Sequence, residues 1–121
     1  MPKVLLVEDD SSISNLYKTE LELRGHQVVV HATGSGVVEK AVETSPDIIL
    51  LDIQLPDKDG LTILKELKEN KRTSEIKVIV VTNYSDDKNV SAALDLGAED
   101  FIPKFRIVPE ELANKVEKMV E

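Results

Sequence analysis

The chain has 121 residues, which suits a single domain with one continuous hydrophobic core, and we expect that domain to occupy residues 1–121. Its 15 Lys and Arg residues against 23 Asp and Glu residues give a formal net charge of −8, which argues against direct binding of nucleic acid. The chain has no cysteine, so we exclude disulfides and thiolate sites. It also has no apolar run near the roughly 20 residues that span a bilayer and no space for a signal peptide, so we expect a cytoplasmic protein without membrane contact.

Short aliphatic runs recur along the chain and predict five β-strands. These runs are apolar at successive positions rather than at alternate ones, as expected for strands that are buried on both faces of a parallel sheet. The predicted strands lie at residues 3–8, 27–32, 47–52, 76–82 and 99–103.

The segments after these strands carry apolar residues at helical spacing and predict five helices. The first ends at Gly25, the second ends before Pro46, the fourth ends at Gly97, and the fifth begins at Pro109. The apolar residues expected on the buried helix faces are, in chain order, Ile13, Leu16, Tyr17, Leu21, Val37, Val38, Ala41, Val42, Leu61, Leu64, Leu67, Val90, Ala93, Leu94, Leu112, Val116 and Met119.

The alternation of strands and helices predicts an α/β fold, a doubly wound five-stranded parallel sheet covered by helices on both faces. We expect the flavodoxin-like (βα)5 arrangement with strand order 2-1-3-4-5. In that order ligands bind beyond the carboxyl ends of the strands, where the order reverses between the first and third strands. The residues that follow each strand are therefore the candidates for function.

Carboxylates follow both strands that meet at this reversal. The first strand runs directly into Glu8, Asp9 and Asp10, and the third runs into Asp52. Carboxylates brought together repel one another unless a cation joins them, and Mg²⁺ is the cation that such oxygen ligands suit best. The pattern predicts a divalent-metal site, with a solvated acidic turn at the start of a helix as the alternative.

Two further polar side chains are expected at the same edge of the sheet. The fourth predicted strand ends at Thr82, and the fifth is followed by Lys104. A hydroxyl and an ammonium beside a metal and carboxylates are suited to contact the oxygens of a phosphoryl group.

With these residues in place, the sequence resembles the receiver domain of two-component response regulators, of the chemotaxis-regulator type, over essentially its whole length. The segments that carry the resemblance are Val7-Glu8-Asp9-Asp10, Asp52-Ile53-Gln54-Leu55-Pro56-Asp57-Lys58-Asp59-Gly60, Val81-Thr82, Gly97-Ala98 and Lys104. The resemblance implies that Asp52 accepts a phosphoryl group from a phosphohistidine and forms an acyl phosphate.

The same resemblance implies a Mg²⁺ site made by Glu8, Asp9 and Asp52, to which Gln54 adds its backbone carbonyl. Lys104 and Thr82 would contact the phosphoryl group in catalysis of its transfer to Asp52.

The resemblance also implies a switch. Thr82 moves toward the phosphoryl group and Phe101 turns inward behind it, which shifts the surface made by the fourth helix, the fifth strand and the fifth helix. The alternative for Phe101 is a plain core aromatic residue.

By resemblance, the partners are a sensor histidine kinase or a histidine phosphotransfer protein, and a downstream protein effector. The chain would be a monomer or a weak phosphorylation-dependent dimer. We expect no output domain in these 121 residues, which would form either a stand-alone receiver or the N-terminal domain of a longer regulator. Candidate contacts to the kinase are Ser12, Asn15, Leu16 and Phe105.

Phe105 and Asn83 depart from the usual pattern of the family: Phe105 stands where the family commonly has proline, and Asn83 replaces a small residue. Gln54 and Tyr84 occupy variable positions that the family uses to tune its rate of self-dephosphorylation. For His26 and His31, outside the pattern, we expect surface or strand roles.

Other functions fit the residues less well. A haloacid dehalogenase phosphatase needs a second aspartate two residues after its nucleophile, where this chain has Gln54. A flavin carrier needs a phosphate-binding loop where Glu8, Asp9 and Asp10 would repel the phosphate. A degenerate receiver that acts only as a binding module remains as the other alternative, and an enzyme that turns over a substrate is not expected.

Overall fold

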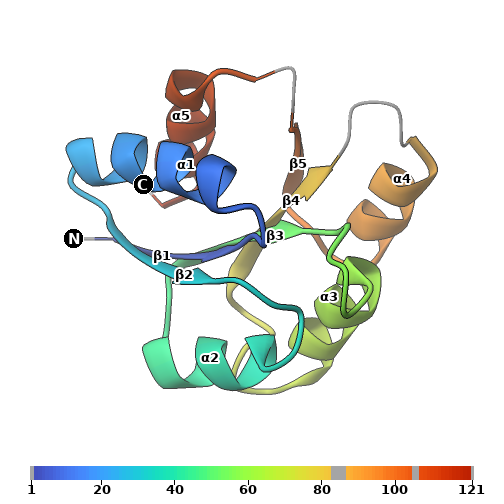
Figure 1. Cartoon of the computed structure of the whole chain (residues 1–121). Helices are drawn as coiled ribbons and strands as arrows, with labels where there is room; N and C mark the ends of the chain where they lie inside the picture. Colours follow the sequence, from blue (N-terminus) through green and yellow to red (C-terminus); the bar gives the residue numbers. More distant parts are fainter. Residues whose placement is uncertain (1, 83–86, 105–106, 121) are drawn as a thin grey trace.

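The computed structural model describes residues 2–82, 87–104 and 107–120, and in these ranges strands alternate with helices as the sequence predicts (Figure 1). The predicted strand boundaries are correct to within one residue. In chain order the elements are β1 (Lys3–Val7), α1 (Ser11–Leu23), β2 (Gln27–His31), α2 (Val37–Thr44), β3 (Ile48–Asp52), α3 (Gly60–Glu69), β4 (Lys77–Thr82), α4 (Asp87–Asp95), β5 (Asp100–Pro103) and α5 (Pro109–Val120).

The strands form one parallel sheet in the order β2-β1-β3-β4-β5. This confirms the predicted flavodoxin-like α/β fold. Helices α1 and α5 cover one face of the sheet, and α2, α3 and α4 cover the other (Figure 1). Because the order reverses between β1 and β3, the loops that follow these two strands diverge to opposite faces and leave their carboxyl ends accessible.

The central strand β3 shows why the sheet is covered on both sides. Its four aliphatic residues, Ile48–Leu51, are fully buried. Successive side chains of a strand point to opposite faces, so Ile49 and Leu51 join the core under α2, α3 and α4, whereas Ile48 and Leu50 join the core under α1 and α5. Each such side chain contributes about 1.5–3 kcal/mol by its burial, so β3 is fixed in register between two cores.

The loops after β1 and β3 lead into α1 and α3, and each of these helices is capped by an aspartate. The Asp10 carboxylate accepts hydrogen bonds from the backbone N–H groups of Ser12, at 2.9 Å, and Ile13, at 3.2 Å, at the start of α1. The Asp59 carboxylate accepts one from the Leu61 N–H, at 3.2 Å, at the start of α3. These caps satisfy backbone donors that the first turn of a helix leaves free. Within the described ranges, none of the helices is long and apolar enough to cross a membrane.

Three side chains differ from the sequence expectations, and for a fourth one alternative is excluded. Leu16 is 53% exposed and Leu94 is 43% exposed. Helix α1 instead buries Tyr17 and Leu21 against the sheet, and α4 buries Ala93. In each case the neighbouring residue lies about 100° around the helix and points away. The expected surface or strand role of His26 is wrong as to the surface, because this residue is 7% exposed. The core alternative for Phe101 is also wrong, because Phe101 is 37% exposed on β5.

Candidate functional site

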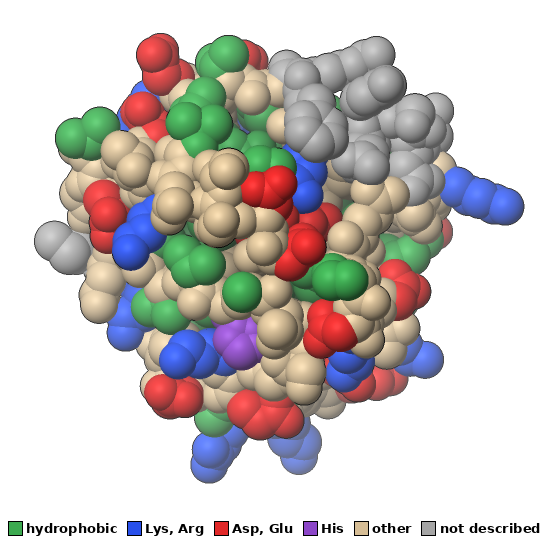
Figure 2. Space-filling view, viewed as in Figure 1, with side chains coloured by type: hydrophobic (Ala, Val, Ile, Leu, Met, Phe, Trp, Pro, Cys, Tyr) green, Lys and Arg blue, Asp and Glu red, His purple; other side chains and the backbone are tan. Residues whose placement is uncertain are grey.

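Three carboxylates converge where β1 and β3 end. Glu8 and Asp9 follow β1 directly and Asp52 is the last residue of β3, and one oxygen from each lies within 4.8 Å of the other two. Glu8 and Asp52 are 2% and 1% exposed, whereas Asp9 is exposed. We call these three residues the acidic site. Figure 2 shows carboxylates beside basic side chains near the centre of the face viewed, where β1 and β3 end in Figure 1.

The ammonium of Lys104, one residue beyond β5, joins two of these carboxylates. Its Nζ lies 2.8 Å from Asp52 Oδ2 and 3.0 Å from Glu8 Oε1. The Lys104 side chain is 10% exposed, so these contacts are screened little by water. Removal of the Lys104 ammonium would leave both buried carboxylates without this cation, which is costly.

The shared cation does not offset the burial of Glu8. Burial raises the pKa of Glu8 from its ordinary value of 4.5 to about 7, although the Asp10 N–H and the Lys104 ammonium act in the opposite direction. Burial also acts to lower the pKa of Lys104, but its hydrogen bonds to Asp52 and Glu8 outweigh burial, and the pKa lies above its usual value. The acidic site therefore has an excess of negative charge that a further cation would relieve.

Thr82 lies at the same edge of the sheet, at the end of β4. It follows Val81, which pairs with Asp52 across the β3–β4 ladder, and it is 1% exposed. Its carbonyl accepts a hydrogen bond of 2.7 Å from the Lys104 N–H. The parallel sheet thus brings Thr82, Lys104 and the acidic site to one edge.

Gln54 holds the orientation of Asp52. Its backbone N–H donates to Asp52 Oδ1 at 2.9 Å, so each oxygen of this carboxylate has a donor, Gln54 on one side and Lys104 on the other. The Gln54 side chain is exposed, and Gln54 forms an isolated β-bridge with Asp59 that closes the base of the loop after β3.

Tyr17 contributes a contact that the sequence does not predict. This α1 residue is 3% exposed, and its hydroxyl donates to the backbone carbonyl of Lys104 at 3.3 Å. The helical pattern identifies Tyr17 only as a core residue. A buried tyrosine needs a partner for its hydroxyl, but the pattern does not show that the partner lies 87 residues away.

The remaining candidates lie around this edge or beyond what is described. Ser12, Asn15 and Leu16 are exposed on α1. The predictions for Asn83, Tyr84 and Phe105 concern positions outside the described residues.

The donor set fits a magnesium ion. Its atoms are carboxylate oxygens, the hard ligands that Mg²⁺ prefers, and Asp9 faces solvent, so a hydrated ion can enter and keep several waters. Among the described residues, the side chains that could together hold a metal ion are these three carboxylates, with no His or Cys among them. Such a set does not favour a soft metal.

Two bacterial regulators have sequences similar to this chain. The chain is 35% identical over 113 residues to the DNA-binding dual master transcriptional regulator RpaA of Synechocystis, with 93% of this chain and 47% of RpaA covered. It is 36% identical over 121 residues to the response regulator ArlR of Staphylococcus saprophyticus, with 99% of this chain and 53% of ArlR covered. The chain thus spans about half the length of the curated relatives it matches.

A solved structure shares the fold at similar identity. The BeF3-activated N-terminal receiver domain of Klebsiella pneumoniae RstA superposes with a TM-score of 0.89 and 30% identity, with 98% of each chain covered. The family model of the response regulator receiver domain matches residues 4–117, a range that includes the acidic site, Thr82 and Lys104. The chain therefore belongs to the receiver domains of two-component response regulators.

Proposed function

We propose that this protein is a phosphoryl-accepting signalling domain in which Asp52 receives the phosphoryl group. The observation that carries the proposal is the position of Asp52, a 1% exposed carboxylate at the reversal of the strand order, 2.8 Å from the Lys104 ammonium. A buried carboxylate held between a backbone N–H and an ammonium is oriented for attack on phosphorus.

The donor is the phosphohistidine of a sensor histidine kinase or of a histidine phosphotransfer protein. An Asp52 carboxylate oxygen forms the new P–O bond, the P–N bond of the phosphohistidine breaks, and the electron pair of that bond stays on the imidazole nitrogen. Lys104 balances the charge on the phosphoryl oxygens, and the Thr82 hydroxyl at the same edge is a second donor to them.

The acidic site and the Gln54 backbone carbonyl are the ligands that would hold Mg²⁺. When bound, the ion neutralises charge on the phosphoryl oxygens. Burial is the main cause of the raised pKa of Glu8, and the negative charge of Asp52 adds to it. A cation at the acidic site would reduce the repulsion between these carboxylates, which supports this role.

The output is a change in the surface formed by α4, β5 and α5. Thr82 and Phe101 are the switch residues: Phe101 is 37% exposed in this structure, and its inward rotation would bury aromatic surface beside β5. Phosphorylation stabilises one of two packings by its differential interaction with them, and a protein effector reads the result. We assign the domain to the cytoplasm, as a monomer or a weak phosphorylation-dependent dimer.

Catalysis is limited to the protein's own phosphorylation and dephosphorylation. A phosphatase that turns over would need an acid and base beside the nucleophile, and Gln54, two residues after Asp52, has an amide that does not titrate.

The test is the intact mass after incubation with acetyl phosphate, with and without Mg²⁺. We expect a Mg²⁺-dependent adduct of about 80 Da, the mass of one phosphoryl group, that is absent from Asp52→Asn. Asp47→Asn is the matched control: Asp47 is an exposed aspartate that accepts the Lys3 N–H at 2.7 Å at the opposite edge of the sheet, and this variant should be modified normally. A folded wild-type protein that forms no adduct, or an adduct that persists in Asp52→Asn, would overturn the proposal.

A further inference from the structure

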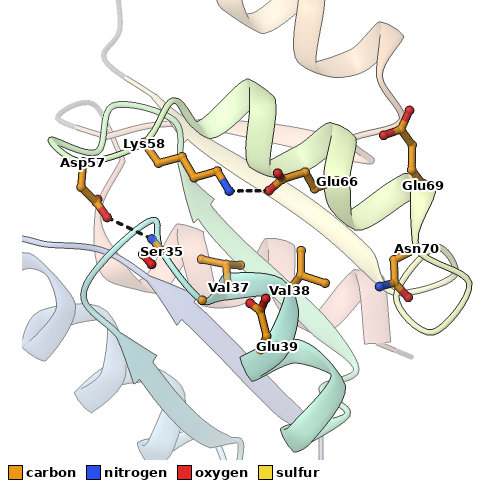
Figure 3. A pocket seen from close by; sticks show the side chains of 10 residues that line it. Ser35, Val37, Val38, Glu39, Asp57, Lys58, Glu66, Glu69 and Asn70 are labelled. Carbon is orange, nitrogen blue, oxygen red and sulfur yellow. Dashed lines mark hydrogen bonds and ion pairs between the residues drawn. The ribbon is translucent and has the colours of Figure 1, made fainter.

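The carboxylate of Asp57 joins two loops whose contact the sequence pattern does not predict. Asp57 lies in the loop between β3 and α3, residues 53–59, and its two oxygens accept hydrogen bonds from the loop between β2 and α2, residues 32–36. Oδ1 accepts the Gly34 N–H at 2.8 Å, and Oδ2 accepts the Ser35 N–H at 3.0 Å. Figure 3 shows the contact with Ser35 at one end of a groove of about 700 Å³ between α2 and α3.

The loop of residues 32–36, which Asp57 contacts, is also held by hydrogen bonds of its own. The Ser35 carbonyl accepts the Thr33 hydroxyl at 3.0 Å and lies 2.7 Å from His31 Nε2. The His31 carbonyl in turn accepts the Glu8 N–H at 3.1 Å. A chain of hydrogen bonds therefore runs from the backbone of Glu8 in the acidic site, through the end of β2, to Asp57.

The two loops approach so closely that Gly34 is required at the contact. A Cβ atom at Gly34 would lie 2.7 Å from Lys58 Cβ and 3.2 Å from Asp57 Oδ1. On its other side the loop of residues 53–59 is attached to α3, because Lys58 Nζ lies 2.7 Å from Glu66 Oε1 (Figure 3). The tip of this loop is thus fastened from both sides.

The base of the same loop contains the residue that orients Asp52. Gln54 donates its N–H to Asp52 Oδ1 and bridges to Asp59, and the Gly60 N–H donates to the Ile53 carbonyl at 3.2 Å. Asp57, at the tip, lies only three residues after Gln54 and two before Asp59. Movement of the tip would therefore change the direction of the Gln54 peptide.

We propose that Asp57 is a positioning residue for the acidic site, which ties the loop of residues 53–59 to the loop of residues 32–36 and so holds the Gln54 peptide in the orientation that Asp52 and Mg²⁺ require. The inference rests on the proposed function. The two backbone N–H groups also hold the pKa of Asp57 below its usual value, so this carboxylate keeps its charge to a lower pH than a free aspartate would.

The experiment compares Asp57→Ala with the wild-type protein in three measurements. These are the Mg²⁺ dissociation constant by calorimetry, amide hydrogen exchange at Gly34, Ser35 and Gln54 by NMR, and the Mg²⁺ dependence of phosphorylation by acetyl phosphate. We expect faster exchange at all three amides and a dissociation constant about tenfold higher, the size typical when an outer support of a metal site is removed. At saturating Mg²⁺ most of the phosphorylation rate should return.

Two further variants separate the tie from a simple loss of charge. Asp57→Asn and Asp57→Ala remove the same charge, but Asn keeps one acceptor oxygen, so Asp57→Asn should lie between the wild-type protein and Asp57→Ala. Gly34→Ala keeps every charge and forces the loops apart, and it should weaken Mg²⁺ binding in the same direction. Asp47→Asn, which removes a backbone acceptor at the opposite edge of the sheet, should change none of these values.

Each result bears on one proposal or on both. If wild type is phosphorylated at Asp52 and Asp57→Ala binds Mg²⁺ equally well, the tie is refuted and the proposed function stands. Equal weakening by Asp57→Asn and Asp57→Ala, with no effect of Gly34→Ala, would assign the effect to charge and also refute the tie. If wild type neither binds Mg²⁺ nor accepts a phosphoryl group, both proposals fail.

Discussion

Glu8 is the residue at which the electrostatics of this protein are least balanced. It is 2% exposed, and it shares the single Lys104 ammonium with Asp52. A carboxylate in that position is more stable protonated than it would be in water, which is why its pKa lies at about 7. At neutral pH the folded, metal-free protein therefore holds a charge that costs it stability.

This imbalance predicts how stability depends on pH. Because the pKa of Glu8 is raised by folding, its favourable contribution is complete below 4.5 and is lost as the pH rises through about 7. Glu8→Gln, which has no charge to lose, should gain stability relative to the wild-type protein across that interval, by at most about 3 kcal/mol. Urea unfolding in EDTA at several pH values measures the difference. A constant difference between the two proteins from pH 4.5 to 7.5 would contradict the assignment, and 10 mM Mg²⁺ should reduce the difference if the acidic site binds the ion.

At the scale of elements, the start of α3 is fixed by how closely it approaches the end of β3. Gly60 is buried, and a Cβ atom there would lie 2.2 Å from the Cα of Ile53 and 2.9 Å from the carbonyl oxygen of Asp52. These are backbone atoms, which cannot move aside as the end of a flexible side chain can. The helix therefore depends on glycine at its first residue.

Gly60→Ala should destabilise the protein by about 3 kcal/mol, the upper part of the range for overpacking, because β3 and α3 must separate. It should also lower the rate of phosphorylation, since Asp52 ends the strand that is displaced. Thermal unfolding and intact mass measure the two effects. Thr62→Ala, an exposed change on the same helix, is the control and should shift stability by less than about 0.5 kcal/mol. Equal stability of Gly60→Ala and Thr62→Ala would contradict this account.

The elements themselves could be predicted from the sequence, because each depends on local signals. Continuous aliphatic runs such as Ile48–Leu51 identify the buried strands, and Pro109 marks the start of α5. The buried face of each helix was predicted less well. Leu16 and Tyr17 are adjacent and both largely apolar, so only packing against the sheet decides that Tyr17 is the buried one.

The convergence of Glu8, Asp9 and Asp52 could also be predicted, since parallel strands in a known order bring their carboxyl ends to one edge. The contacts that support these residues could not. Asp57 meets Gly34 from 23 residues away, and the two belong to loops whose paths follow no periodic pattern. The burial of His26, beside Glu117 of α5, likewise depends on tertiary packing alone.

At the scale of the whole molecule, binding of a cation at the acidic site is linked to folding. An ion that binds only the folded chain stabilises it by mass action, by about 1.4 kcal/mol at ten times its dissociation constant. For a chain of this size we therefore expect Mg²⁺ to raise the melting temperature by about 3–6 °C. Asp52→Asn should reduce the rise, and Asp47→Asn should not. An equal rise in all three proteins would place the ion elsewhere on this acidic molecule.

The first and last described parts of the chain lie at the edge of the sheet opposite the acidic site. The Pro2 carbonyl accepts the Gln27 N–H at 2.8 Å where β2 begins, and Lys77, at the start of β4, donates its Nζ to the Met119 carbonyl near the end of α5. Both attachments lie a full strand length from the acidic site. A fluorescent reporter or an immobilising tag fused at either end would leave the reactive edge open, so the protein can be tethered to a sensor surface and presented with phosphodonors in solution.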